Sequence, residues 1–241
     1  WEDQHVGPNA VIEAGGEFGL PRIGADAYSV TAVESGWMPM PLPAIYHSAE
    51  MQPYREWLTT NNLETIGSLG GSFQSDDITD YYVDPIELGY QNIIDWDRDF
   101  IGRDALQARR TSQRRVKRSL IWNSDDVMQA QRSSLFPNGR GPARYISTPS
   151  PMYATWEADA VMRGDDMVGI SQWSAYSPNA QTYLSLATID LDHAEPGTEV
   201  VLIWGEPDSR RASVEKHVPF EIRATVAPAP YFEKVIKSGA Q

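Results

Sequence analysis

The 241-residue sequence contains no cysteine, which excludes disulfide bonds, thiolate metal sites and a cysteine nucleophile. It has only four histidines, and no two of them fall within one short metal-binding motif. We therefore predict no metal site and interpret the histidines as surface or loop residues. They are His5, His47, His193 and His217.

Long apolar runs are also missing. No stretch approaches the roughly 18 to 20 apolar residues that a membrane-spanning helix needs, and no charged and then apolar leader of the secretory kind is present. The formal net charge of −13 repels phosphate backbones, and the sequence has one short basic run. We expect a cytoplasmic protein with no nucleic-acid partner and no membrane partner.

The apolar residues that are present predict two kinds of structure. Before residue 112, helical patterns near residues 8–16, from Pro53 and after Gly102 alternate with segments rich in glycine and proline. Later, short apolar runs separated by turn residues are typical of antiparallel strands in a sandwich or barrel. These runs are 120–122, 168–173, 183–189, 200–204 and 220–226. The sequence therefore predicts an α+β fold.

Two charged segments allow more than one interpretation. The aspartates between Asp76 and Asp84 could bind a hard cation, although a solvated acidic face or a helix cap is the favoured interpretation. The basic run from Arg109 to Arg118 could receive an anionic tail, but an exposed helix end followed by an interdomain linker is favoured. The glycines of residues 67–71 match neither phosphate-binding loop.

One group of aromatic residues, with small residues among them, lies between Tyr28 and Tyr82. Their faces stack on flat rings, and a tyrosine hydroxyl can donate a proton where an ether oxygen becomes a phenolate. The alternative is a core rich in tyrosine and tryptophan. The residues concerned are Tyr28, Trp37, Tyr46, Tyr54, Trp57, Phe73, Tyr81 and Tyr82.

Several segments resemble the tetrahydrofolate-dependent methyltransferases typified by the glycine-cleavage T-protein, an aminomethyltransferase. Residues 99–106 resemble the family's D-F-I-G-R-E-A-L helix start, and residues 13–36 resemble its succession of E-A-G, G-A-R-D and L-E-A-G. Residues 85–90 and 168–187 resemble two further elements in the correct order. The resemblance implies the C-terminal portion of a folate-binding catalytic region over residues 1–112. It also implies a jelly-roll-like barrel domain over residues 113–241.

A narrower resemblance is to the O-demethylases of lignin aromatic catabolism, which act on vanillate- or syringate-like aryl methyl ethers. It covers residues 27–29, 34–37, 41–44, 54–58, 67–73 and 80–82. It implies transfer of a methyl group to N5 of a tetrahydrofolate cofactor, with a phenol as the other product and no metal. Tyr28 would lie beside the methyl-bearing oxygen as hydrogen-bond donor or general acid. Trp37 would pack against the pterin or the substrate ring.

Two departures from the family pattern matter. Asp26 stands where the family has an arginine, so contacts to the folate tail are not expected there. The family's N-terminal half, which supplies much of the folate cavity, would have to come from the rest of the same protein or from a separate chain. We expect residues 1–241 to be inactive without it.

Other functions remain open. The same fold could act on an aminomethyl donor attached to a lipoyl carrier, or on a methylated sulfur or nitrogen compound. A noncatalytic binding or interaction module, in which the aromatic residues only form a core, is the alternative from a different class.

Overall fold

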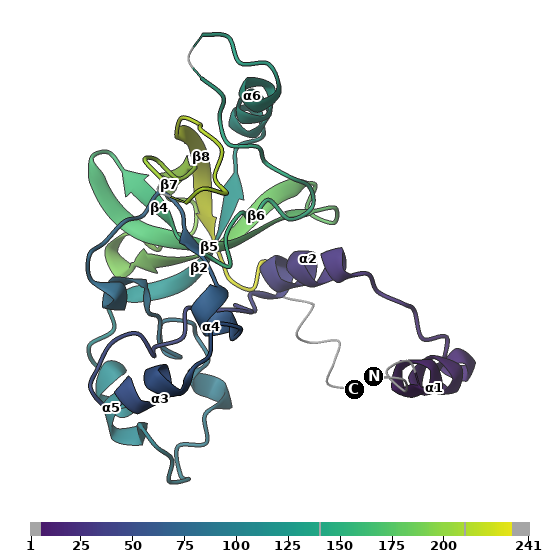
Figure 1. Ribbon diagram of the computed structural model, residues 1–241, viewed down its shortest axis with the longest axis vertical. Helices are drawn as coiled ribbons and strands as arrows, with labels where there is room; N and C mark the ends of the chain where they lie inside the picture. Colours follow the sequence, from purple (N-terminus) through teal and green to yellow (C-terminus); the bar gives the residue numbers. More distant parts are fainter. Residues whose placement is uncertain (1–5, 140, 210, 233–241) are drawn as a thin grey trace.

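The computed structural model describes residues 6–139, 141–209 and 211–232, and it combines a six-stranded barrel with a mainly helical part (Figure 1). The barrel closes in the order β2-β6-β5-β4-β7-β8, and all neighbouring strands in it are antiparallel. This confirms the predicted α+β fold with an antiparallel barrel. The strands are β2 (Arg115–Trp122), β4 (Asp159–Arg163), β5 (Asp166–Ser177), β6 (Thr182–Asp190), β7 (Glu199–Trp204) and β8 (Phe220–Ala227).

The barrel interior is filled by large apolar side chains that alternate along the strands. On β2, Val116, Leu120 and Trp122 belong to this core, because side chains two residues apart lie on the same face of a strand. The rings of Trp122 and Trp204 lie 5.5 Å apart between centroids. Both indole N–H groups donate hydrogen bonds, to Ser185 Oγ and to the Arg144 carbonyl, so neither is buried without a partner.

One further helix, α6 (Ser124–Leu135), follows β2 and lies beside the barrel (Figure 1). It begins where the Asn123 side chain accepts a hydrogen bond from the Asp126 N–H at 3.1 Å, a standard N-cap. The Asp126 carboxylate also pairs with Arg223 of β8 at 2.8 Å. That contact fixes the start of the helix to the barrel wall.

The helical part precedes the barrel and consists of short elements. Figure 1 places α3, α4 and α5 together beneath the barrel, whereas α1 extends away from it. The elements are α1 (Val6–Gly15), η1 (Gly16–Phe18), α2 (Ala25–Ser35), α3 (Gln52–Trp57), α4 (Leu63–Ile66), η2 (Ile78–Tyr81), η3 (Gln91–Ile93) and α5 (Arg103–Arg109). A two-stranded parallel sheet of β1 (Leu69–Gly70) and β3 (Trp156–Glu157) joins this part to the chain that enters β4. After β6, η4 (Leu191–His193) is a single turn that leads to β7.

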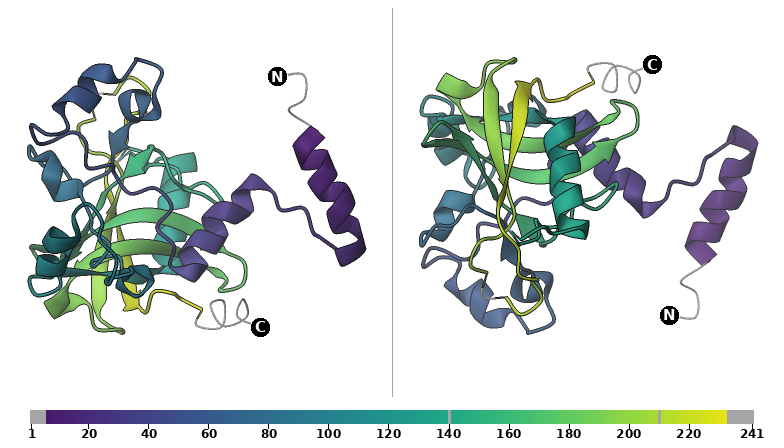
Figure 2. Two further views of the ribbon diagram at one scale, coloured as in Figure 1. Left: turned by 90° about the horizontal axis from the view of Figure 1, so that it is seen from below. Right: turned by 90° about the horizontal axis from the view of Figure 1, so that it is seen from above.

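Helix α2 packs on the outer face of strands β5 and β6, and the views in Figure 2 place it there from two directions. Its Ala32 and Val33 are buried against Trp173 of β5 and Leu184 of β6, with further apolar neighbours. This second core lies outside the barrel. It is the contact that positions α2 and the residues that follow it.

Most of the predicted elements are present. The three predicted helices correspond to α1, α3 and α5, and the five predicted strands correspond to β2, β5, β6, β7 and β8. Residues 29–33 are helical and belong to α2. Among the described residues, each helix is too short or too polar to cross a lipid bilayer. The division at residues 112 and 113 stays a prediction.

The interpretation of the basic run as a linker was wrong for its second half. Arg115, Lys117 and Arg118 belong to β2. The Arg115 guanidinium pairs with Glu87 at 3.1 Å, and Lys117 is 7% exposed. Charged residues in a strand were taken for a linker because the cover that buries them comes from residues remote in sequence.

Candidate functional site

The first predicted site residue, Tyr28, lies on the outer face of α2. It is 55% exposed, and it shares that face with Thr31, whereas Ala32 and Val33 point into the core. Thr31 Oγ1 donates to the carbonyls of Ala27 and Tyr28, so it stays on the helix. Within the described residues, the Tyr28 hydroxyl has no hydrogen-bond partner. It is therefore free to bond with a ligand.

The second predicted site residue, Trp37, follows α2 directly. Gly36 ends the helix with a φ of 71°, which turns the chain so that the Trp37 ring stacks on Tyr90 with centroids 5.4 Å apart. Trp37 remains 48% exposed. The structure therefore brings Tyr28 and Trp37 to one helix and the turn that ends it, as surface aromatics and not as core residues.

A buried carboxylate anchors the end of α2. Glu34 is 6% exposed, and it accepts hydrogen bonds from Ser177 Oγ at 2.5 Å and Asn179 Nδ2 at 3.0 Å. Its main-chain carbonyl accepts from the N–H of Tyr231 at 3.1 Å. Three segments far apart in sequence thus meet at Glu34. Burial of a carboxylate is costly without hydrogen-bond donors, so the bonds from Ser177 and Asn179 stabilise Glu34 in this position.

Two side chains that sequence reasoning missed hold residues 36–38. Lys117 Nζ donates to the Gly36 carbonyl at 2.5 Å and lies 4.2 Å from the centroid of the Tyr90 ring. The Tyr90 hydroxyl accepts from the Met38 N–H at 2.7 Å. Burial lowers the pKa of Lys117 to about 8. No local signal reveals Lys117 as a buried cation, because Gly36 and Tyr90, which contact its ammonium, are remote from it in sequence.

Gly36 offers a direct test of this turn. A Cβ at Gly36 would lie 3.1 Å from Pro230 Cα, whereas one at Gly89, with nearly the same φ of 72°, would meet open space. Left-handed backbone costs a non-glycine residue about 1–2 kcal/mol, so G89A should lower the free energy of unfolding by that amount. G36A should lower it by more, as measured by urea denaturation. Equal losses would contradict the close approach.

A groove of about 990 Å³ lies between the helical part and one end of the barrel. Tyr82, Asp84 and Arg109 line it from one side, and Ile170 and Asp190 line it from the other. Two of its arginines are already partnered, because Arg109 Nε lies 2.7 Å from Asp84 Oδ2 and Arg115 Nε lies 3.1 Å from Glu87 Oε1. Neither Tyr28 nor Trp37 lines this groove.

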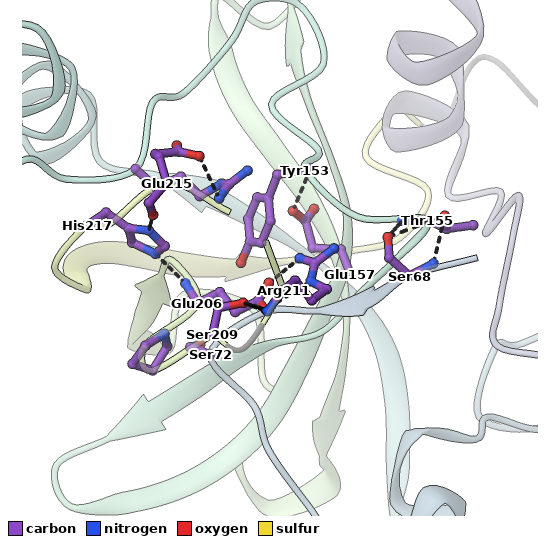
Figure 3. A network of polar contacts seen from close by, with 12 residues as sticks. Ser68, Ser72, Tyr153, Thr155, Glu157, Glu206, Ser209, Arg211, Glu215 and His217 are labelled. Carbon is purple, nitrogen blue, oxygen red and sulfur yellow. Dashed lines mark hydrogen bonds and ion pairs between the residues drawn. The ribbon is translucent and has the colours of Figure 1, made fainter. Parts of the chain in front are cut away.

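Two further buried acids, Glu157 and Asp159, lie where β3 leads into β4, and Figure 3 shows Glu157 beside Tyr153. Glu157 is 4% exposed and Asp159 is 2% exposed. Asp159 Oδ1 accepts from the Tyr153 hydroxyl at 2.8 Å and from the Ser72 N–H at 3.1 Å. Burial raises the pKa of Asp159 to about 7, and burial together with the Asp159 charge raises the pKa of Glu157 well above its ordinary value. Neither acid lines the groove.

The loop between β7 and β8 closes over this group with its own polar contacts (Figure 3). Arg211 pairs with Glu206, and the Glu206 N–H donates to His217 Nε2 at 2.7 Å. Because Nε2 accepts, the proton of a neutral His217 is on Nδ1, which faces the Glu215 carbonyl at 2.8 Å. His217 is thus a loop histidine with a structural contact, as is His193, which bonds to Arg163. His5 lies outside the described residues.

The predicted acidic segment has structural roles in the described residues. Asp77 accepts from the Thr79 N–H at 2.9 Å and caps η2. Asp84 Oδ1 accepts from the N–H groups of Ile86 and Glu87. In the part of the chain that the structure describes, no cluster of three or more acidic or histidine side chains has the arrangement of a metal site.

No known family model matches the chain. Syringate O-demethylase of a Sphingobium species is 36% identical over 233 residues, which cover 96% of this chain and 50% of that enzyme. Sesamin methylene transferase of a Sinomonas species is 29% identical over 249 residues, which cover 96% of this chain and 52% of that enzyme. The chain is a homologue of these enzymes. This similarity confirms the predicted relationship to the O-demethylase group of methyltransferases.

The chain spans about half the length of these curated relatives. Among solved structures, glycine cleavage system aminomethyltransferase T from Bartonella henselae matches 62% of this chain and 32% of its own. The TM-score is 0.36 at 13% identity, which is too weak a likeness to define the fold.

Proposed function

We propose that the chain is part of a tetrahydrofolate-dependent O-demethylase that transfers the methyl group of a vanillate- or syringate-like aryl methyl ether to tetrahydrofolate. The observation that carries the proposal is the 36% identity to syringate O-demethylase along nearly the whole chain. The exposed Tyr28 and Trp37 support it, because an aromatic pair that served only as core would be buried.

The side chains present fit a flat cofactor. Trp37 has one ring face against Tyr90 and is half exposed, so the other face is available to a pterin. When bound, tetrahydrofolate supplies the N5 nitrogen that accepts the methyl group. Asp26 lies exposed in the first turn of α2, where its charge favours the helix N-terminus and offers nothing to an anionic folate tail.

The proposed role of Tyr28 is to hold and move one proton. Its free hydroxyl would donate a hydrogen bond to the ether oxygen of the substrate and pass its proton to that oxygen as the bond to the methyl carbon breaks. The tyrosine would regain a proton from the amine that becomes methylated. The helix places this hydroxyl at the surface, so other groups must exclude water. We propose that the half of the protein absent from this chain supplies that cover.

Exposed apolar side chains support such a partner region. The segment from α1 to the start of α2 has no buried residue before Ala32, and it carries large apolar residues that water surrounds. They are Val6, Val11, Phe18, Leu20 and Ile23. Whether the remaining half belongs to the same protein or to a separate chain is tested by intact-mass measurement of the purified protein. The cytoplasmic location stays a prediction.

The experiment is an assay of the full-length protein with tetrahydrofolate. Vanillate and syringate are offered in parallel, and the released phenol and the methylated folate are quantified by chromatography. We expect equal amounts of the two products, and residues 1–241 alone should give neither. Absence of tetrahydrofolate binding by the full-length protein in calorimetry would overturn the proposal.

A second candidate follows from the relative named for methylene transfer, which is 29% identical to this chain. The assay therefore includes sesamin as donor. Consumption of sesamin without demethylation of vanillate or syringate would assign the chain to methylene transfer. Activity on an aminomethyl donor alone would assign it to aminomethyl transfer, and activity on a methylated sulfur or nitrogen compound alone would assign it to demethylation of that compound.

A further inference from the structure

Three consecutive residues after α2 are each held by a side chain from elsewhere in the sequence. Lys117 Nζ bonds the Gly36 carbonyl, the Tyr90 ring stacks on Trp37, and the Tyr90 hydroxyl accepts from the Met38 N–H. The Lys117 ammonium also lies 4.2 Å from the Tyr90 ring centroid. The backbone on both sides of Trp37 and the indole itself are therefore fixed.

Lys117 is an unusual residue for this position. Lys117 shares the outer face of β2 with Ile121, which packs in the apolar core under α2. The lysine is only 7% exposed. Among the described residues, the ion pairs are formed by arginines, and no carboxylate lies within ion-pair distance of the Lys117 ammonium. A buried charge without a counter-ion is costly, so packing alone would favour an apolar residue.

The Lys117 ammonium instead contacts the Gly36 carbonyl and the Tyr90 ring. An ammonium over an aromatic face is attracted to it, more strongly when water is excluded. Both contacts act on the same short segment, residues 36–38, whose central side chain is half exposed. Met38, which the Tyr90 hydroxyl holds, is buried in the apolar core under α2, whereas fixing the half-exposed indole of Trp37 adds nothing evident to that core. It does lower the ordering cost for a ligand that stacks on that indole.

We propose that Lys117 and Tyr90 are positioning residues that set the plane of the Trp37 indole, so that its outer face is ready for the pterin ring of the cofactor. This inference rests on the proposed function for the identity of the ring. The two residues act through Trp37 and the backbone, and neither is required to touch the ligand. Loss of either should therefore weaken cofactor binding with little effect on the chemical step.

The first test reads Trp37 directly and needs no ligand. Full-length protein is labelled with 5-fluorotryptophan, and the Trp37 fluorine resonance is assigned by its loss in Trp37→Phe. We expect Tyr90→Leu and Lys117→Met to shift or broaden that resonance while the resonances of Trp122 and Trp204 stay in place. Lys216→Met, at an exposed lysine, is the matched control and should change nothing. An unchanged Trp37 resonance in both variants overturns the inference.

The second test separates positioning from a merely structural role. A stacked aromatic pair is worth about 0.5–1.5 kcal/mol beyond its buried area, which corresponds to roughly 3- to 10-fold in affinity. We expect Tyr90→Leu and Lys117→Met to raise the KM for tetrahydrofolate by about that factor with kcat changed less than about twofold. Tyr90→Phe, which keeps the ring, should restore most of the affinity.

Each outcome decides a different claim. A changed resonance with unchanged KM overturns the role in cofactor binding. A fall in kcat that Tyr90→Phe does not restore overturns positioning in favour of general destabilisation. If the wild-type protein binds no tetrahydrofolate, the proposed function fails, and the fluorine resonances still decide whether Lys117 and Tyr90 fix the indole.

Discussion

The variant Tyr28→Phe is expected to lower kcat for demethylation of the aryl methyl ether by about 100-fold or more. General acid contributions of positioned side chains are typically about 10²- to 10⁴-fold, and this change removes the hydroxyl while it keeps the ring. Tyr28 is 55% exposed, so its loss should not alter the core. The KM values should change little, because the ring that packs against ligands is retained.

The measurement is the initial rate of phenol release by the full-length protein at saturating tetrahydrofolate. Tyr145→Phe is the matched control, since Tyr145 is 50% exposed and lies on a loop of the barrel. If both variants keep the wild-type rate, Tyr28 is not the proton donor. The noncatalytic interpretation of the aromatic residues would then gain support.

A second large effect is expected in stability against pH, because Asp159 is buried with its pKa raised to about 7. The unfolded chain releases this proton near pH 4, so between about pH 4 and pH 7 the folded state binds more protons. The stabilisation is complete below pH 4 and is lost as the pH rises through 7. A difference of about three pH units between the two states corresponds to roughly 4 kcal/mol at most.

The test is urea denaturation at several pH values between 4 and 7.5. Asp159→Asn keeps an oxygen that can accept from Tyr153 and Ser72, and it removes the titrating proton. We expect a shallower fall of stability with pH in this variant, with a remaining slope from Glu157. Asp165→Asn, at an exposed acid, should keep the wild-type slope, and an equal slope in all three proteins would contradict the assignment.

Lys117 changes the stability with pH in the opposite direction to Asp159, and it does so in a higher pH range. Burial lowers its pKa to about 8, so between about pH 8 and pH 10.5 the unfolded chain binds more protons than the folded one. Its contribution makes stability rise with pH in that range. Measurements below pH 7.5 therefore report the acids and leave Lys117 mostly charged in both states.

Local patterns were sufficient to predict the barrel strands. Apolar runs such as Val200–Trp204 lie between turn residues, and this local pattern is sufficient to predict a strand. Strand β4 was not predicted because it begins at Asp159, and aspartate is usually exposed in folded proteins. Helix α6 was also not predicted, because few of its residues are buried, so its apolar pattern is sparse.

The candidate site was only partly predictable, for a related reason. Tyr28 and Trp37 could be named from a local motif, and the structure places both at the surface of one helix and its end. The partners of that segment lie 52 and 81 residues away from it, at Tyr90 and Lys117. Local spacing carries no information on such contacts, since they depend on how strand β2 is covered.

The chain after β8 returns to α2, where the N–H of Tyr231 donates to the Glu34 carbonyl. An isolated barrel cut at residue 113 would lose that partner, and Trp173 and Leu184 would be stripped of their apolar cover. Such a fragment should aggregate and should be less stable than the whole chain, because it exposes apolar surface. A fragment designed to express the barrel should therefore include α2, although the segment between α5 and β2 lies at the predicted domain boundary.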